Sequence, residues 1–189
     1  MSNDAGSIAA LDEQHRGDVE GGRHAAAALV VLVASWSLAV AAVVLGVINR
    51  PVSHPGTWYY VVDVADAIVF GAVGAVLVAR TSQVTAWIVS VTAVGGGLAA
   101  IASQWFELTL EDPDLPALPI LSSMQNWAWI PGTLGLILVV PYLVRERSAG
   151  PVTIAAVAAG VVTTAVLFVT RLTDPFPWPE GESMAPLAV

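Results

Sequence analysis

Residues 25–48 read AAAALVVLVASWSLAVAAVVLGVI and contain no Asp, Glu, Lys or Arg. A helix of about 20 apolar residues is long enough to cross the hydrocarbon core of a bilayer. Four further apolar stretches follow along the chain, at about residues 58–79, 84–106, 127–144 and 152–172. Each must be helical in a membrane, because a helix satisfies its own backbone hydrogen bonds there. The sequence therefore predicts an all-α, polytopic transmembrane helical bundle of about five spans.

The composition also indicates a membrane location. Of the 189 residues, 56% are hydrophobic and only 12% are charged, whereas about a quarter of the residues in a soluble domain are charged. We expect a multi-pass protein of the plasma membrane, with the lipid bilayer as a partner. The net charge of −8 argues against a nucleic-acid partner, because phosphate is bound by basic surface.

No catalytic or cofactor-binding motif is found in the sequence. The chain has neither cysteine nor lysine, which excludes disulfides, Cys-ligated metals and Schiff-base chemistry. It also lacks G-x-S-x-G, H-E-x-x-H and a glycine-rich phosphate loop. His54, Asp63, Asp66 and Glu107 lack the short, fixed spacing of a metal site. We predict no enzymatic activity, no cofactor and no metal for this chain.

The arginines predict the orientation of the bundle, because positively charged residues accumulate on the cytoplasmic side. With the N-terminus inside, five arginines are cytoplasmic and two are external. The inner set is Arg16, Arg23, Arg80, Arg145 and Arg147, and the outer set is Arg50 and Arg171. Tryptophans 58, 105, 127 and 129 all fall at the predicted outer ends of spans. We therefore predict an N-in/C-out topology.

Three regions are expected along the chain. Residues 1–23 are polar and acidic and cannot bury enough apolar surface to offset ordering, so they are predicted to be a disordered cytoplasmic tail. Residues 24–173 form the five-helix transmembrane domain, in which residues 107–126 are predicted to be an external loop. Residues 174–189 are rich in proline and acid and are predicted to be an irregular outer tail.

Two carboxylates interrupt the second apolar stretch, in VVDVADAIVF at residues 61–70. Asp63 and Asp66 are three residues apart, so they share one face of a helix. A charged side chain deep in lipid costs at least a few kcal/mol and normally faces the bundle or a wet cavity. We therefore expect both acids to turn inward, near the outer end of the second span.

Other polar residues are expected at the same level, from the third span, the fourth span and the first outer loop. The resulting sensory polar cluster comprises Asp63, Asp66, Gln104, Glu107, Gln125, Asn126, Arg50 and His54. A purely structural role remains open, with the acids solvated or paired with Arg50. A pocket that senses a ligand, a proton or lipid is the functional alternative. Ion translocation is disfavoured, because the inner halves of the spans are almost entirely apolar.

Small residues and prolines predict how the spans pack. Gly71, Gly74 and Ala75 in the second span and residues 95–97 in the third favour close helix–helix contact. Such faces would also suit a homodimer. Pro131 and Pro141 lie within the fourth span and predict kinks there, because each removes a backbone hydrogen bond.

Several short motifs resemble a known pattern: LVAR at 77–80, TSQVTAW at 81–87, ASQWFEL at 102–108, NWAWIPG at 126–132 and TDPF at 173–176. Residues 58–180 thereby resemble the N-terminal membrane-sensor region of actinobacterial-type two-component sensor histidine kinases. The sequence departs from that pattern in VPYLVRER after the fourth span, and it contains neither a phosphoacceptor helix nor an ATP-binding domain.

The resemblance implies a role in signal transduction. The chain would be the signal-sensing transmembrane portion of a histidine-kinase-like receptor, without catalytic activity of its own, and a kinase domain would have to lie outside it. The alternative is a stand-alone multi-span membrane protein of structural or small-transporter type.

Overall fold

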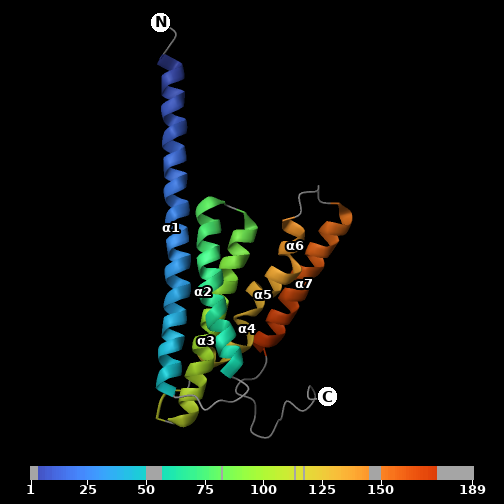
Figure 1. Cartoon of the computed structure of the whole chain (residues 1–189). Helices are drawn as coiled ribbons and strands as arrows, with labels where there is room; N and C mark the ends of the chain where they lie inside the picture. The colour runs from blue at the N-terminus through green and yellow to red at the C-terminus, as the bar shows by residue number, and fades with distance from the viewer. Residues whose placement is uncertain are drawn as a thin grey trace.

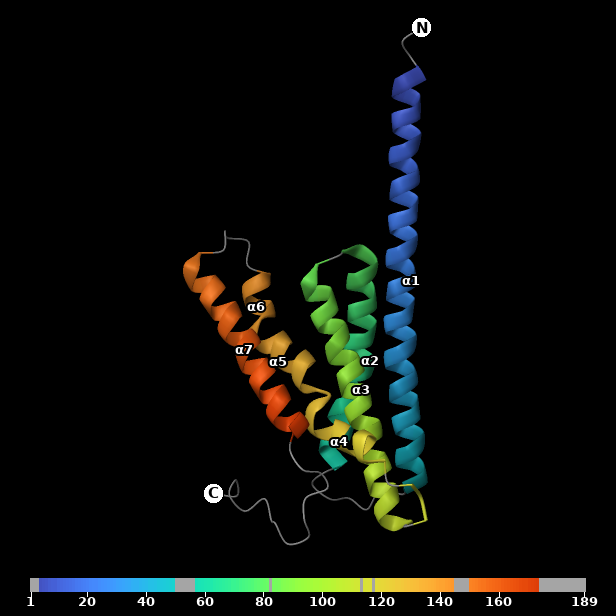
Figure 2. The ribbon, with the colours of Figure 1, turned by 180° about the vertical axis from the view of Figure 1, so that it is seen from behind.

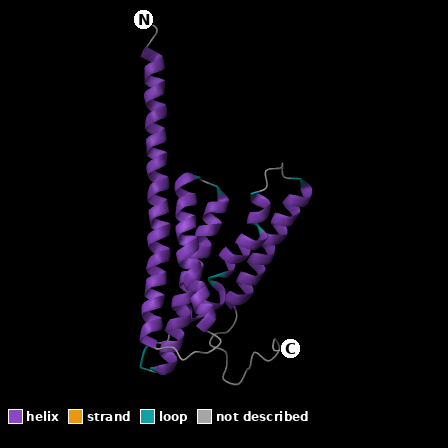
Figure 3. Cartoon of the chain, viewed as in Figure 1, coloured by secondary structure: helices purple, strands orange, loops and turns teal. Residues whose placement is uncertain are grey.

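The computed structural model describes residues 4–49, 57–81, 83–112, 114–116, 118–144 and 150–173, and within these ranges every regular element is a helix (Figures 1 and 3). The helices are α1 (Asp4–Asn49), α2 (Thr57–Arg80), α3 (Val84–Glu111), α4 (Pro119–Trp127), α5 (Ile130–Leu138), α6 (Val140–Leu143) and α7 (Pro151–Thr173). The predicted all-α fold is confirmed. Arg50, His54 and the tail predicted over residues 174–189 lie outside the described residues.

Five helical stretches are long and apolar enough to cross a membrane, as the hydropathy of the sequence predicts. They are Gly21–Asn49, Tyr59–Arg80, Val84–Leu110, Ser123–Leu143 and Pro151–Thr173. Many of their large apolar side chains, such as Val30, Val69 and Val162, remain exposed on the outer faces. That arrangement suits a hydrocarbon solvent and not water. The chain is an integral membrane protein.

Successive spans run in opposite directions, so the bundle has two ends (Figure 1). We call the end that carries Asn49 and the start of α2 the Asn49 end, and the opposite end the Arg80 end. Helices α1, α2 and α3 pack side by side, each against the other two (Figures 1 and 2). Ala28, Ala75, Val78 and Ala86 form a buried apolar cluster among them. Helix α5 packs on α3 and on α7, while α6 and α7 diverge from α3 towards the Arg80 end (Figures 1 and 2).

Glycines allow the closest contacts between these helices. A Cβ added to Gly74 of α2 would lie 2.8 Å from the Oγ and 3.2 Å from the Cα of Ser90 in α3. A Cβ added to Gly132 of α5 would collide with the backbone of Thr92 in α3. Small residues let membrane helices approach until their backbones touch. The prediction of close helix packing is therefore confirmed, and these glycine faces are used within the chain.

The fourth span is broken at two points, as its prolines predict. Helix α4 ends at Trp127, α5 begins at Ile130 and α6 begins at Val140. Pro131 and Pro141 stand at the start of α5 and α6, where the missing N–H costs least. Proline has no backbone N–H to donate to the carbonyl four residues earlier, so the series of helical hydrogen bonds is interrupted in the turn before each proline.

The predicted loop of residues 107–126 is partly helical, which corrects the sequence prediction. Helix α3 continues to Glu111, and α4 occupies Pro119–Trp127. Proline in the first turn of α4 favours a helix start at that position. Gln125 and Asn126 therefore belong to a helix that packs mainly against α3 and α7.

The structure also differs from the disordered tail predicted for residues 1–23. Helix α1 runs without a break from Asp4 to Asn49 and extends far past the Arg80 end of the bundle (Figure 1). At 1.5 Å per residue its 46 residues span about 69 Å. Once a helix is nucleated in its apolar half, adding residues is inexpensive, and no proline interrupts this segment.

Candidate functional site

A polar joint connects α1 to α3 at the Asn49 end. The Nδ2 of Asn49 donates hydrogen bonds to the backbone oxygen of Gln104 (2.7 Å) and to its Oε1 (3.1 Å). Asn49 is 7% exposed and Gln104 is 6% exposed. Buried amides are costly unless they are bonded, so this joint fixes the last turn of α1 against α3.

Two further hydrogen bonds tie α1 to α2. The hydroxyl of Tyr60 donates to the backbone oxygen of Ala42 at 3.0 Å. The indole Nε1 of Trp36 donates to the backbone oxygen of Ile68 at 3.2 Å. Helix α1 is thus held to both of its neighbours by polar contacts as well as by packing.

The acid pair lies where α2 meets α3. A Cβ built on Gly96 of α3 would be 3.0 Å from the backbone oxygen of Asp63 and 3.1 Å from the Cβ of Asp66. Both aspartates are half-buried. The side chain of Asp66 therefore leaves α2 directly beside α3, at a point where a side chain larger than glycine would be tightly packed.

The remaining residues of the predicted cluster are spread over the Asn49 end. Gln104 is buried in the joint with Asn49, and Glu107 lies half-buried one turn further along α3. Gln125 and Asn126 are half-buried on α4, which packs against α3. Arg50 and His54 lie outside the described residues. The structure thus shows Asp63 and Asp66 together at one helix contact and Gln104 at another.

Asn49 and Tyr60 are the site residues that the sequence prediction missed. Asn49 stands in INRP, at the very end of an apolar stretch, and reads there as the first residue of a loop. An amide in the last turn of a span is the signal that points to it, because such a group needs a partner on another helix. Its partner lies 55 residues away in the chain.

Two buried polar atoms at this end have no hydrogen-bond partner among the described residues: the Oδ1 of Asn49 and the Nε1 of Trp105. Buried polar atoms are bonded in nearly all cases. The acceptor and the donor come from adjoining parts of α1 and α3, so this end retains hydrogen-bonding capacity beyond its own joint. Within the described ranges no three His, Asp or Glu side chains gather as metal ligands.

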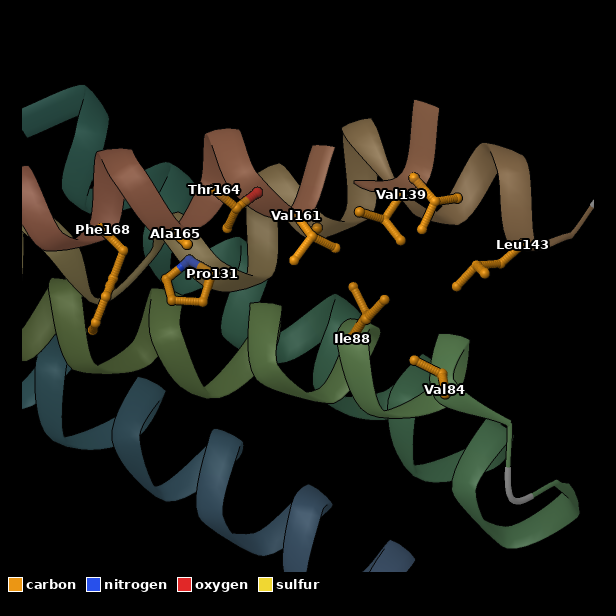
Figure 4. Close-up of a pocket in the computed structure, with 11 residues that line it drawn as sticks. Val84, Ile88, Pro131, Val139, Leu143, Val161, Thr164, Ala165 and Phe168 are labelled. Atoms are coloured by element: carbon orange, nitrogen blue, oxygen red, sulfur yellow. The ribbon is translucent and has the colours of Figure 1, made fainter. Parts of the chain in front are cut away.

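An apolar groove lies on the other side of α3, between that helix and the broken fourth span and α7 (Figure 4). Its volume is about 560 Å³. Helix α3 contributes Val84 and Ile88, the fourth span contributes Val139 and Leu143, and α7 contributes Val161 and Phe168. Thr164 also lines the groove, but its hydroxyl bonds to the backbone oxygen of Gly160 at 2.8 Å. The walls are therefore effectively all hydrocarbon.

No family model, no curated protein and no solved structure matches this chain. The fold and composition define an integral membrane protein with five candidate spans, a polar joint and acid pair between α1, α2 and α3, and an apolar groove beyond α3.

Proposed function

We propose that the chain is a non-catalytic membrane receptor, in which the acid pair Asp63/Asp66 receives the stimulus and α1 passes it on. The observation that carries this proposal is the form of α1. It is one unbroken helix, bonded to α2 and α3 within the bundle, and it projects past the bundle at the Arg80 end (Figure 2). Because α1 is bonded to both α2 and α3, a movement of α2 relative to α3 is expected to displace α1.

The acid pair is suited to cause such a movement. A carboxylate inside a membrane span costs a few kcal/mol, so its neutralisation by a proton or a cation changes the preferred packing of its helix. Asp66 adjoins Gly96, where α2 and α3 are already in close contact. A closely packed contact responds to such a change by shifting between arrangements and not by gradual deformation.

The transporter alternative is less well supported by the described core. The buried cluster of α1, α2 and α3 near the Arg80 end consists of Ala28, Ala75, Val78 and Ala86. The nearby hydroxyls of Ser35 and Ser90 bond to their own helices. A conducting path needs polar groups along its whole length. In the described part of α1, α2 and α3, the buried polar side-chain contact between helices lies at the Asn49 end, and the cluster near the Arg80 end is apolar.

The orientation and the signalling class belong to the same proposal. With the N-terminus inside, the Asn49 end faces outward and the projecting N-terminal part of α1 lies in the cytoplasm, where a signal would be delivered. The motif resemblance over residues 58–180 favours a histidine-kinase-like receptor as the class, with the kinase core contributed by sequence outside these residues.

Spin-label distances test the proposal, because the chain has no native cysteine. Labels at Arg23→Cys in α1 and Gln83→Cys beside α3 occupy two exposed positions. In nanodiscs, acidic buffer is expected to shift their distance by about 2 Å or more. Asp63→Asn/Asp66→Asn is expected to hold the acidic-state distance at every pH.

The control is Asp114→Asn, which removes an exposed acid outside the spans and should leave the pH response intact. An identical distance distribution for all three proteins at every pH would refute the proposal. Proton flux in proteoliposomes that Asp63→Asn abolishes would instead support the transporter alternative.

A further inference from the structure

Two adjacent glycines, Gly21 and Gly22, lie in α1 at the point where this helix leaves the bundle. Both are exposed, as is Arg23, and His24 is the first half-buried residue after them. The first buried residue after them, Ala28, lies about 9 Å from Gly22 along the helix axis, in the apolar cluster with α2 and α3. The part of α1 before Gly21, residues 4–20, projects beyond the bundle, and we call it the arm (Figures 1 and 2).

Close packing does not account for this pair of glycines. At each described helical glycine from Gly46 to Gly160, an added Cβ would come within 4 Å of an atom from another part of the bundle. A Cβ added to Gly21 or Gly22 would meet nothing within 4 Å. Within the described structure, the pair therefore serves no helix–helix contact.

The pair also stands at the boundary between two solvents. Gly21 begins the stretch that is apolar enough to cross a membrane, and the acidic residues Asp18 and Glu20 come just before it. A helical hydrogen bond cannot be exchanged for a bond to water inside a bilayer, whereas at its surface it can.

Glycine is among the least favourable residues for a helix interior, because it has the most backbone freedom to lose. Compared with alanine, one glycine raises the population of the opened helix about fivefold, and two raise it about twentyfold. Since no neighbour supports Gly21 and Gly22, nothing in the described structure offsets this effect. Helix α1 is therefore weakest where it leaves the bundle.

We propose that Gly21 and Gly22 form a joint at which the arm changes its direction relative to the bundle. Sharp helix bends occur at pairs of small residues, and hinges consist of a few residues that absorb the change in backbone angles. The arm and the span stay connected through the joint, so a displacement of α1 still moves the base of the arm. The joint does not depend on a receptor role and holds equally for a stand-alone membrane protein.

Spin-label distances in nanodiscs test the joint on the full chain, which has no native cysteine. Labels at Glu13→Cys and Gln83→Cys join the arm to the bundle. The reference pair, Arg23→Cys with Gln83→Cys, lies entirely on the bundle side of the joint. The arm pair is expected to give a distance distribution about twice as wide as the reference pair, or wider. Equally narrow distributions would overturn the proposal, because the arm would then be a rigid extension of the span.

Alanine substitutions locate the bend. Gly21→Ala/Gly22→Ala is expected to narrow the arm distribution to the width of the reference pair, because alanine favours the helix. Val19→Ala/Glu20→Ala changes the two preceding residues to the same side chain and should leave the distribution wide. Equal widths in the two variants would contradict the proposal, since the bend would then not originate at the glycines.

A label pair within the arm separates bending at the joint from unfolding of the arm. Ile8→Cys and Glu20→Cys are about 18 Å apart along a helix. One narrow distance is expected for this pair, with and without the alanines at positions 21 and 22. A distribution that is broad with the glycines and narrow with the alanines would show that the whole arm folds and unfolds, and it would overturn the proposal.

Discussion

Asn49 and Gln104 form a buried hydrogen-bonded pair that joins the end of α1 to α3, with the Nδ2 of Asn49 2.7 Å from the Gln104 backbone oxygen and 3.1 Å from its Oε1. The pair lies at the same end of the bundle as the acids on α2. It therefore links the helix that projects from the bundle to the helix that contacts Asp66.

Asn49→Leu is expected to destabilise the bundle by about 1–2 kcal/mol, because it removes two hydrogen bonds and leaves the Gln104 amide buried without them. Unfolding in mixed micelles measures the loss. Gln104→Leu should cost less, because it removes only the bond to Oε1 and leaves the backbone oxygen of residue 104 to accept from Asn49. The double variant should cost less than the two separate losses combined, since both variants remove the Oε1 bond. Additive losses would show that the two side chains do not act as a pair.

Gly132→Leu is expected to separate α5 from α3 and to lower the free energy of unfolding by about 3 kcal/mol or more, because its side chain would collide with the backbone of Thr92. The same substitution at Gly150, which has no neighbouring atom within 4 Å of an added Cβ, serves as the control. Thermal unfolding monitored by circular dichroism compares the two. Equal midpoints would contradict the close contact between α3 and α5.

Asp66→Asn is expected to stabilise the protein by about 1 kcal/mol at neutral pH, although it removes the proposed stimulus-receiving group. The reason is that an amide of nearly the same shape avoids the cost of a charge within a membrane span. Asp114→Asn, outside the spans, should change stability by much less. A clear loss of stability in Asp66→Asn would indicate a structural role for the carboxylate and would weaken the receptor proposal.

The sequence predicts the spans well because the property that places them is local. A run of apolar residues such as 25–48 must be helical in a membrane whatever surrounds it. The breaks of the fourth span are equally local, since Pro131 and Pro141 each remove a hydrogen bond from their own helix. The close contact of Gly74 was predictable for the same reason, since it follows from the absence of a side chain.

Features that depend on distant partners were not predictable in the same way. The role of Asn49 requires knowledge of Gln104, which lies on another helix. The groove results from the angle between α3 and α7 (Figure 1), and no residue pattern on either helix specifies that angle alone. The helical start of α1 was missed because the prediction used only the polar composition of residues 4–23. It did not consider that the helix of the adjoining apolar span extends back through them.

Accessibility of single cysteines in intact cells tests most directly the claim that five spans place the acid pair near the outer face. Gln83→Cys lies at the Arg80 end and Asp114→Cys at the Asn49 end, with α3 between them. We predict that a membrane-impermeant maleimide labels Asp114→Cys in intact cells and Gln83→Cys only after permeabilisation. Labelling of both positions from the same side, or the reverse pattern, would contradict the account.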